Sequence, residues 1–318
     1  MKKSLLFSLL FTVCGAVFAD DPNPTTVVGS KEDTQMAKTK AIYAEGPKTL
    51  SYKEDTPGTA EMFQALQILK SNPKDKTTQE DAFNLLKKAA DKGNYVAQRE
   101  VGNWYLNGFG TSQNSDKAIA YFQKAIDQGD PQSMIALGVY YVNGTGGITK
   151  NFETANRYFE QAAAIDKNKR LYTYIGNTFL KSGSEVSGTF ALPWLQKGAQ
   201  AGDSTAQYLL SYCYLQGVGT PKNTKEGLIE LQKAGDSLNP LALADMALIF
   251  EKGMFEQKEN LKAAYLLYTL SITGTPVSAE GQERVSKQLS KVDLKKVNQW
   301  MNQIYKGKPL SEIIQFKL

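Results

Sequence analysis

Two stretches of this 318-residue chain carry residue types that could do chemistry. Ser71 and Lys74 have the Ser-x2-Lys spacing in which a lysine can activate a serine nucleophile. No Ser-Asp-Asn or Lys-Thr-Gly element follows, and Pro73 places the pair in a loop. Gly144–Lys150 is as rich in glycine as a phosphate loop but lacks the Gly-x4-Gly-Lys-Ser/Thr spacing. We therefore expect a structural turn there and no catalysis at either stretch.

The remaining reactive residue types are few. The chain contains no histidine, which removes the commonest general base and the commonest metal ligand. Cys213 lies beside Tyr214 in a predicted helix, and a packed thiol is favoured over a nucleophile because no histidine could activate it. No Asp-x-Asp-x-Asp-Gly calcium loop is present. These observations predict a non-enzymatic protein with no cofactor and no metal.

The charge of the chain is mild and mixed. It has 37 basic and 32 acidic residues, a formal net charge of +5. A nucleic-acid-binding domain usually carries a stronger and more clustered positive charge, so we expect no nucleic acid partner.

Residues 1–19 have the features of a secretory signal peptide. Two lysines open the segment, an apolar run spans 5–13, and Ala19 ends a small-residue cleavage pattern. A retained anchor is the alternative, but the apolar run is short for a membrane span. Lipid attachment at Cys14 is disfavoured by the bulky residue before it. Since only Cys213 would remain after cleavage, we expect a soluble mature chain without disulfides, periplasmic or secreted, and associated with the cell envelope only through a partner.

A pattern that returns about every 36 residues organises the chain between Tyr95 and Ser271. Each copy has a small residue, preceded by an apolar one and followed three residues later by an aromatic one. The small residues are Gly102, Gly138, Gly176, Ser211 and Ala247. These positions cover the buried side of a helix, and the small residue lets a partner helix approach closely. Each copy therefore predicts a helix A, a glycine-containing turn, a helix B and a return turn.

Some segments depart from this pattern. In the third copy Lys181–Ser184 replaces the Gly-x-Gly turn, and we expect Pro193 at a first helical turn or a kink. Near the end, Leu294, Val297, Met301 and Ile304 form one apolar stripe. This amphipathic helix could bind a membrane or a partner, but a solenoid needs a cap on its last apolar face, and we favour the cap. We expect the tail 310–318 to be loosely attached.

The predicted organisation has five parts. They are a signal peptide at 1–19, a flexible leader at 20–58, a degenerate helix hairpin at 59–94, the repeats at 95–272, and capping helices with a tail at 273–318.

The repeat resembles a known family. The first full copy reads Ala97-x3-Val101-Gly102-x2-Tyr105-x2-Gly108-x-Gly110, followed by Lys117-Ala118-x2-Tyr121-Phe122-x-Lys124-Ala125-x3-Gly129. This element is similar to the Sel1-like repeat, a subclass of the tetratricopeptide-like α/α solenoids. The likeness covers roughly residues 80–272. It implies an all-α superhelix of about five helix hairpins with helical caps, A helices that line a concave groove, and a scaffold role. Exported bacterial members are often envelope or secreted adaptors. Some cysteine-rich members are linked to β-lactam binding or hydrolysis, but this chain lacks their paired cysteines.

Counted from the small residue of each copy, positions −3 and +1 share a face distinct from the aromatic core. The resemblance places this face on the concave groove, and we predict a protein or peptide partner there because Asn and Arg can meet backbone groups and Tyr supplies contact area. The candidates are Arg99, Asn103, Ile135, Val139, Thr173, Asn177, Tyr208, Tyr212 and Leu248. The alternative is that these residues only contact neighbouring repeats.

Our hypothesis is a non-catalytic exported scaffold, acting in cell-envelope assembly or host interaction. The alternative function is an enzyme or binder that acts on a cell-wall or β-lactam substrate.

Overall fold

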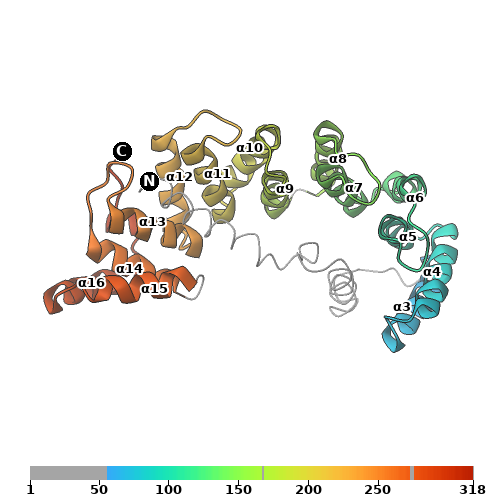
Figure 1. The fold of residues 1–318 in the computed structure, drawn as a ribbon, viewed down its shortest axis with the longest axis horizontal. Helices are drawn as coiled ribbons and strands as arrows, with labels where there is room; N and C mark the ends of the chain where they lie inside the picture. The colour runs from blue at the N-terminus through green and yellow to red at the C-terminus, as the bar shows by residue number, and fades with distance from the viewer. Residues whose placement is uncertain (1–55, 167, 273–275, 318) are drawn as a thin grey trace. The chain divides into compact units, whose positions relative to one another are not determined.

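The structure, a computed structural model, describes residues 56–166, 168–272 and 276–317 (Figure 1). Within these ranges it contains 14 α-helices, one short 3-10 helix and no strand, so the expectation of an all-α fold is confirmed. The described chain divides into two compact units, here called the N-terminal and the C-terminal unit, with the boundary between Asn168 and Lys169.

The described part of the N-terminal unit consists of three helix hairpins. In each, two consecutive helices pack side by side (Figure 1). The helices are α3 (Thr59–Ser71), α4 (Lys76–Asp91), α5 (Tyr95–Asn107), α6 (Ser115–Asp127), α7 (Pro131–Asn143) and α8 (Phe152–Ile165).

The C-terminal unit repeats this hairpin arrangement three times and then adds two helices. Its helices are α9 (Lys169–Lys181), α10 (Glu185–Gln200), α11 (Ser204–Gln216), α12 (Thr224–Asp236), α13 (Pro240–Lys252), α14 (Leu261–Ser271), α15 (Pro276–Ser286), α16 (Lys291–Tyr305) and the 3-10 helix η2 (Leu310–Glu312). The A helices of the five full copies are α5, α7, α9, α11 and α13, and the fold is the predicted α/α solenoid of helix hairpins.

The small residue of each copy has the predicted role. A Cβ placed on Gly102 would lie 2.9 Å from the Phe122 ring, and one placed on Gly138 would lie 2.5 Å from the Phe159 ring. In each case the aromatic ring belongs to helix B of the same hairpin. In these two hairpins the helices approach closely because helix A offers no side chain at the point of contact.

The helix ends follow local sequence signals. The A helices α5, α7, α11 and α13 end on a left-handed glycine, which begins the glycine-containing turn that the repeat predicts; these residues are Gly108, Gly144, Gly217 and Gly253. Most helices begin with an Asn or Asp whose side chain accepts a backbone N–H; these residues are Asp75, Asn94, Asn114, Asp130, Asn151, Asp203, Asn223, Asn239 and Asn260.

Two expectations about local structure need correction. Pro193 lies in the interior of α10, so its placement in a first helical turn is wrong, and a kink at this residue stays a prediction. The tail is not loosely attached, because Leu310, Ile314 and Phe316 are all buried. The tail residues face apolar surface on the last hairpin, which a short sequence window does not contain.

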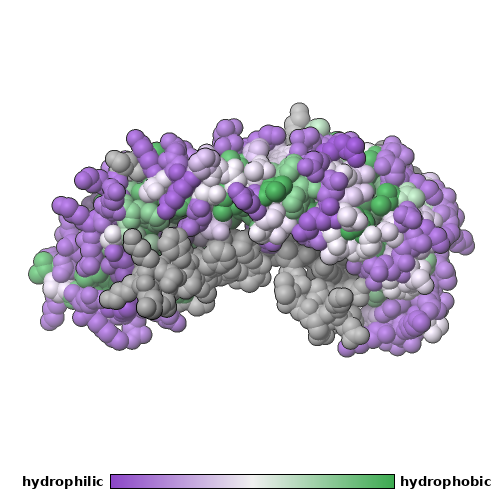
Figure 2. All heavy atoms as spheres, turned by 45° about the horizontal axis from the view of Figure 1, so that its top comes forward, coloured by the Kyte–Doolittle hydropathy of each residue, from purple (hydrophilic) through white to green (hydrophobic). Residues whose placement is uncertain are grey.

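The last two helices pack on α14. Val297 and Ile304 of α16 are buried in this contact. The helix α15 is attached through Arg284, whose guanidinium donates two hydrogen bonds of 2.8 Å to the buried carboxylate of Glu251 on α13. Outside such contacts the described surface seen in Figure 2 is mostly hydrophilic, with small apolar areas between polar side chains.

Candidate functional site

The predicted binding residues at position −3 reach towards the next repeat. Arg99 of α5 donates from Nη1 to both carboxylate oxygens of Asp130, at 3.2 and 3.1 Å. Asp130 is the N-cap of α7 and also accepts hydrogen bonds from Ser133. Arg99 therefore joins two consecutive A helices.

Tyr208 makes the equivalent contact in the C-terminal unit. Its side chain is only 2% exposed, and its hydroxyl donates a 3.0 Å hydrogen bond to Asp245 Oδ2 on α13. Burial raises the pKa of Asp245 to about 7, although the hydrogen bond from Tyr208 acts in the opposite direction. The second oxygen, Asp245 Oδ1, is buried and has no hydrogen-bond partner among the residues that the structure describes.

Thr173 completes this set. It is buried, and a Cβ placed on Gly198 of α10 would lie 2.9 Å from its hydroxyl oxygen. The same Cβ would lie 2.7 Å from Ala206 of α11, so Thr173 lies where three helices meet. Arg99, Thr173 and Tyr208 therefore all contact neighbouring helices, and binding of a partner by these residues stays a prediction. Ile135, the remaining candidate at this position, is half-buried.

The predicted residues at position +1 have more varied environments. Asn103, Val139 and Tyr212 are half-buried, whereas Asn177 and Leu248 are 8% and 7% exposed. Asn177 Oδ1 accepts no hydrogen bond from any described residue. Binding of a partner by these five residues stays a prediction.

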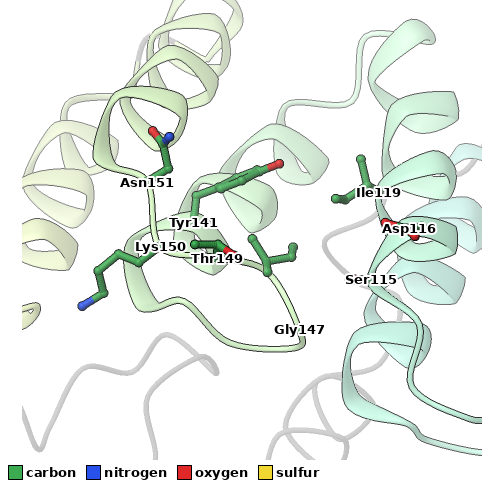
Figure 3. Close-up of a pocket in the computed structure, with 9 residues that line it drawn as sticks. Ser115, Asp116, Ile119, Tyr141, Gly147, Thr149, Lys150 and Asn151 are labelled. Atoms are coloured by element: carbon green, nitrogen blue, oxygen red, sulfur yellow. The ribbon is translucent and has the colours of Figure 1, made fainter.

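A shallow pocket of about 300 Å³ lies in the N-terminal unit, beside the stretch Gly144–Lys150 (Figure 3). One side comes from the first turns of α6, with Ser115, Asp116 and Ile119. The other side comes from Tyr141 and the turn between α7 and α8, and the Lys150 ammonium points away from the pocket. Because Gly144 and Gly146 have left-handed φ angles of 65° and 67°, this stretch is the structural turn that the sequence predicts.

Two other candidate reactive groups have structural roles. Ser71 ends α3, where its exposed hydroxyl donates 2.6 Å to the carbonyl oxygen of Ile68. Cys213 is fully buried, as expected for a packed thiol. Within residues 56–166, 168–272 and 276–317, no group of three or more Asp, Glu or Cys side chains could hold a metal ion.

The same part of the chain contains no helix that is both long enough and apolar enough to cross a membrane. The predicted signal peptide at 1–19 and most of the leader at 20–58 lie outside the described residues.

Sequence reasoning missed several groups with distinctive environments. Asp245 and Glu251 are buried carboxyls in α13, and Gln257 is a buried amide in the loop that follows. A charge at Asp245 within the apolar run of α13 was the available signal. Nothing in the local sequence marks Gln257, since its hydrogen-bond partner Lys317 is 60 residues away.

The repeated hairpins define an α/α solenoid repeat protein. The Sel1 repeat pattern matches residues 73–94, 96–130, 131–166, 204–237 and 240–274, together about half of the chain. The chain therefore belongs to the Sel1 repeat family. Its irregular third copy lies outside these matches, yet α9 and α10 form a hairpin there like the others.

Individual relatives are distant. An uncharacterized Sel1-like repeat-containing protein of Schizosaccharomyces pombe is 25% identical over 206 residues, which is 60% of this chain and only 31% of that protein. A crystal structure of a protective antigen present in uropathogenic Escherichia coli strains, displaying an SLR fold, has 19% identity and a TM-score of 0.49, covering 91% of this chain and 60% of that one. A Sel1 repeat protein from Oxalobacter formigenes has 24% identity and a TM-score of 0.45, covering 77% and 100%. Sel1 repeat proteins generally act as scaffolds for protein–protein interaction.

Proposed function

We propose that this chain is a non-catalytic exported scaffold that holds a protein or peptide partner on its A helices. Membership of the Sel1 repeat family supports the scaffold role. The proposed binding residues are the +1 residues of each unit, Asn103 and Val139 in the N-terminal unit and Asn177, Tyr212 and Leu248 in the C-terminal unit. The −3 residues Arg99 and Tyr208 are instead engaged with the next repeat.

The observation that carries this assignment is the run of five Sel1 repeats, because proteins built from this repeat generally act as scaffolds for protein–protein interaction. Within the C-terminal unit, the half-buried Tyr212 on α11 offers aromatic contact area to such a partner.

The binding test is capture of a partner by the purified mature chain, using crosslinking and mass spectrometry. Asn177→Ala combined with Tyr212→Ala should lower capture of the main crosslinked partner about tenfold, since hydrogen-bonding and aromatic contacts at an interface centre dominate affinity. Lys287→Ala, at an exposed site just after α15, is the matched control. Tyr208→Ala is unsuitable, because it would leave Asp245 without its hydrogen bond. Unchanged capture by the double variant would refute the proposed face.

Export rests on residues 1–19, with their basic start, apolar run and small residue at Ala19. Cell fractionation followed by N-terminal sequencing should give a mature chain that begins at Asp20, outside the cytoplasm. A chain that keeps residues 1–19 would contradict cleavage. Turnover of a β-lactam that is lost on Ser71→Ala would overturn the non-catalytic assignment.

A further inference from the structure

The tail of the chain is bound to the last hairpin as a ligand would be. Residues 313–317 follow η2 without regular structure, yet Ile314 and Phe316 are only 4% and 7% exposed. Gln315 between them is exposed. Alternate side chains therefore face the protein, as in an extended peptide seated on a surface.

The Gln257 side chain forms hydrogen bonds with both backbone groups of one tail residue, Lys317. Its Nε2 donates 2.8 Å to the carbonyl oxygen of Lys317, and its Oε1 accepts 2.6 Å from the Lys317 N–H. This two-way pair has the same donors and acceptors as a residue pair in a β-ladder. It recognises an extended backbone and not a particular side chain.

Side-chain contacts add selectivity beside this backbone pair. Phe316 stacks on Phe250 of α13 with 5.2 Å between ring centroids and 9° between planes. Near the start of the tail, the Ser311 N–H donates a 2.7 Å hydrogen bond to Asp236 at the end of α12. The site thus combines an aromatic platform with fixed polar groups.

The loop that presents Gln257 has an unusual backbone. Phe255 and Glu256 have positive φ angles of 53° and 63°, although neither is glycine. The corresponding second turn position in other copies is a glycine, at Gly110, Gly146 and Gly219. Left-handed conformations of such residues cost of order 1 kcal/mol each and cluster at ligand clamps. Gln257 itself is 6% exposed and also donates to the Phe255 carbonyl oxygen, which fixes its side chain.

We propose that Phe250 and Gln257 form a peptide-binding site that the chain's own residues 310–317 occupy as an internal ligand. The external ligand of this site is an extended segment of a partner protein with an aliphatic-x-aromatic pattern like Ile314-Gln315-Phe316. It binds when the tail leaves. This site is distinct from the +1 face of the A helices, so it goes beyond the proposed function.

The connection of the tail to α16 allows the tail to leave the site and be replaced by an external peptide. Gly307 joins α16 to the tail; it has φ 87°, and a Cβ placed on it would have no atom within 4 Å. The terminal elements of a solenoid contact neighbours on one side only and open most easily. Because the tail is tethered, its effective concentration at the site is roughly millimolar, and it suppresses binding of a free peptide in the intact chain.

The test is fluorescence anisotropy with a labelled peptide of the sequence of residues 307–317. Three proteins are compared: the intact mature chain, a chain ending at Lys308, and that shortened chain with Gln257→Ala. The shortened chain should bind the peptide at least about tenfold more tightly than the intact chain, because the competing tail is gone. Gln257→Ala should remove this gain, whereas Gln288→Ala, at an exposed amide on the same unit, should keep it. A peptide with Ile and Phe exchanged for Ser should not bind.

Intact Phe316→Ala provides a second readout that needs no truncation. It should bind the peptide more tightly than the unmodified intact chain, and circular dichroism checks that its helices remain. Equal affinity of the intact and shortened chains, or a shortened chain that self-associates without binding the peptide, would overturn the proposal. Since Gln257→Ala should leave capture by the A helices unchanged, failure here is distinguishable from failure of the scaffold proposal.

Discussion

Replacing Arg284 by methionine should weaken the attachment of α15 to the last hairpin. Glu251 is 4% exposed and accepts hydrogen bonds from four donors: Arg284 Nε and Nη2, the Tyr268 hydroxyl at 2.8 Å, and the Lys252 ammonium at 2.7 Å. Methionine keeps much of the length of arginine but donates no hydrogen bond. It leaves the Glu251 carboxylate buried with half of its donors missing.

The pKa of Glu251 gives the size of the effect. Burial by itself raises this pKa, but the hydrogen bonds from Arg284, Lys252 and Tyr268 outweigh it and lower the pKa from 4.5 to about 2. Such a difference corresponds to about 3 kcal/mol of stability at neutral pH. Because the folded-state pKa is depressed, this stability is present above pH 4.5 and is lost as the pH falls towards about 2. The Arg284 side chain is 45% exposed, so solvent screens its part of this stabilisation. We therefore expect Arg284→Met to lower the free energy of unfolding by about 2 kcal/mol.

The assay is urea unfolding of the mature chain at pH 7 and pH 3, followed by far-ultraviolet circular dichroism. Hydrogen exchange should show faster exchange in α15 of the Arg284→Met variant at pH 7. Glu251→Gln should flatten the dependence of stability on pH below 5. Lys287→Met is the matched control, since its partner Glu283 is 72% exposed and the loss should stay below about 0.5 kcal/mol. Equal midpoints for Arg284→Met and Lys287→Met, or unchanged pH dependence in Glu251→Gln, would refute the reasoning.

Three further predictions concern the repeats. Gly138→Ala should lower the free energy of unfolding by about 1–3 kcal/mol, because its Cβ would lie 2.5 Å from the Phe159 ring. In urea unfolding, adding Phe159→Leu to this variant should recover part of the loss. No recovery would count against this contact. Burial raises the pKa of Asp245 from 3.8 to about 7, so the folded state favours the protonated acid. The free energy of unfolding should therefore fall as the pH rises from about 4 to about 7. Asp245→Asn should remove this decline in urea unfolding at several pH values, and a pH profile identical to that of the unmodified chain would contradict the assignment. Arg99→Met should lower the free energy of unfolding by more than about 1 kcal/mol, because the Asp130 side chain is 4% exposed and loses its charged partner. Lys76→Met, which removes an exposed ion pair with Glu80 at 3.9 Å, should be nearly neutral by the same measurement.

The hairpins could be predicted because their signal is local and repeated. Gly102 and Gly138 meet Phe122 and Phe159 within about 20 residues of chain, and each copy presents the same pairing. Left-handed glycines such as Gly108 mark helix ends through their own backbone requirements. The third copy shows the limit, since Pro193 lies inside α10, where neighbouring helices support a segment that local propensity disfavours.

The candidate site was predictable only in part. The sequence placed Arg99, Thr173 and Tyr208 on the A helices, but helical periodicity does not state which neighbour a side chain meets. The distance between consecutive repeats decided that Tyr208 reaches Asp245, 37 residues later. Likewise, the tail carries an ordinary apolar pattern, and only the assembled last hairpin brings Gln257 to Lys317.

The sequence by itself thus determined the repeat unit, its length and its buried face, because these depend on contacts between residues a few turns apart. The tertiary structure alone decided which polar side chains join repeats and which retain unmet hydrogen-bonding capacity. It also decided where the tail binds. These outcomes depend on burial and on partners distant in the chain, and neither has a local signature in the sequence.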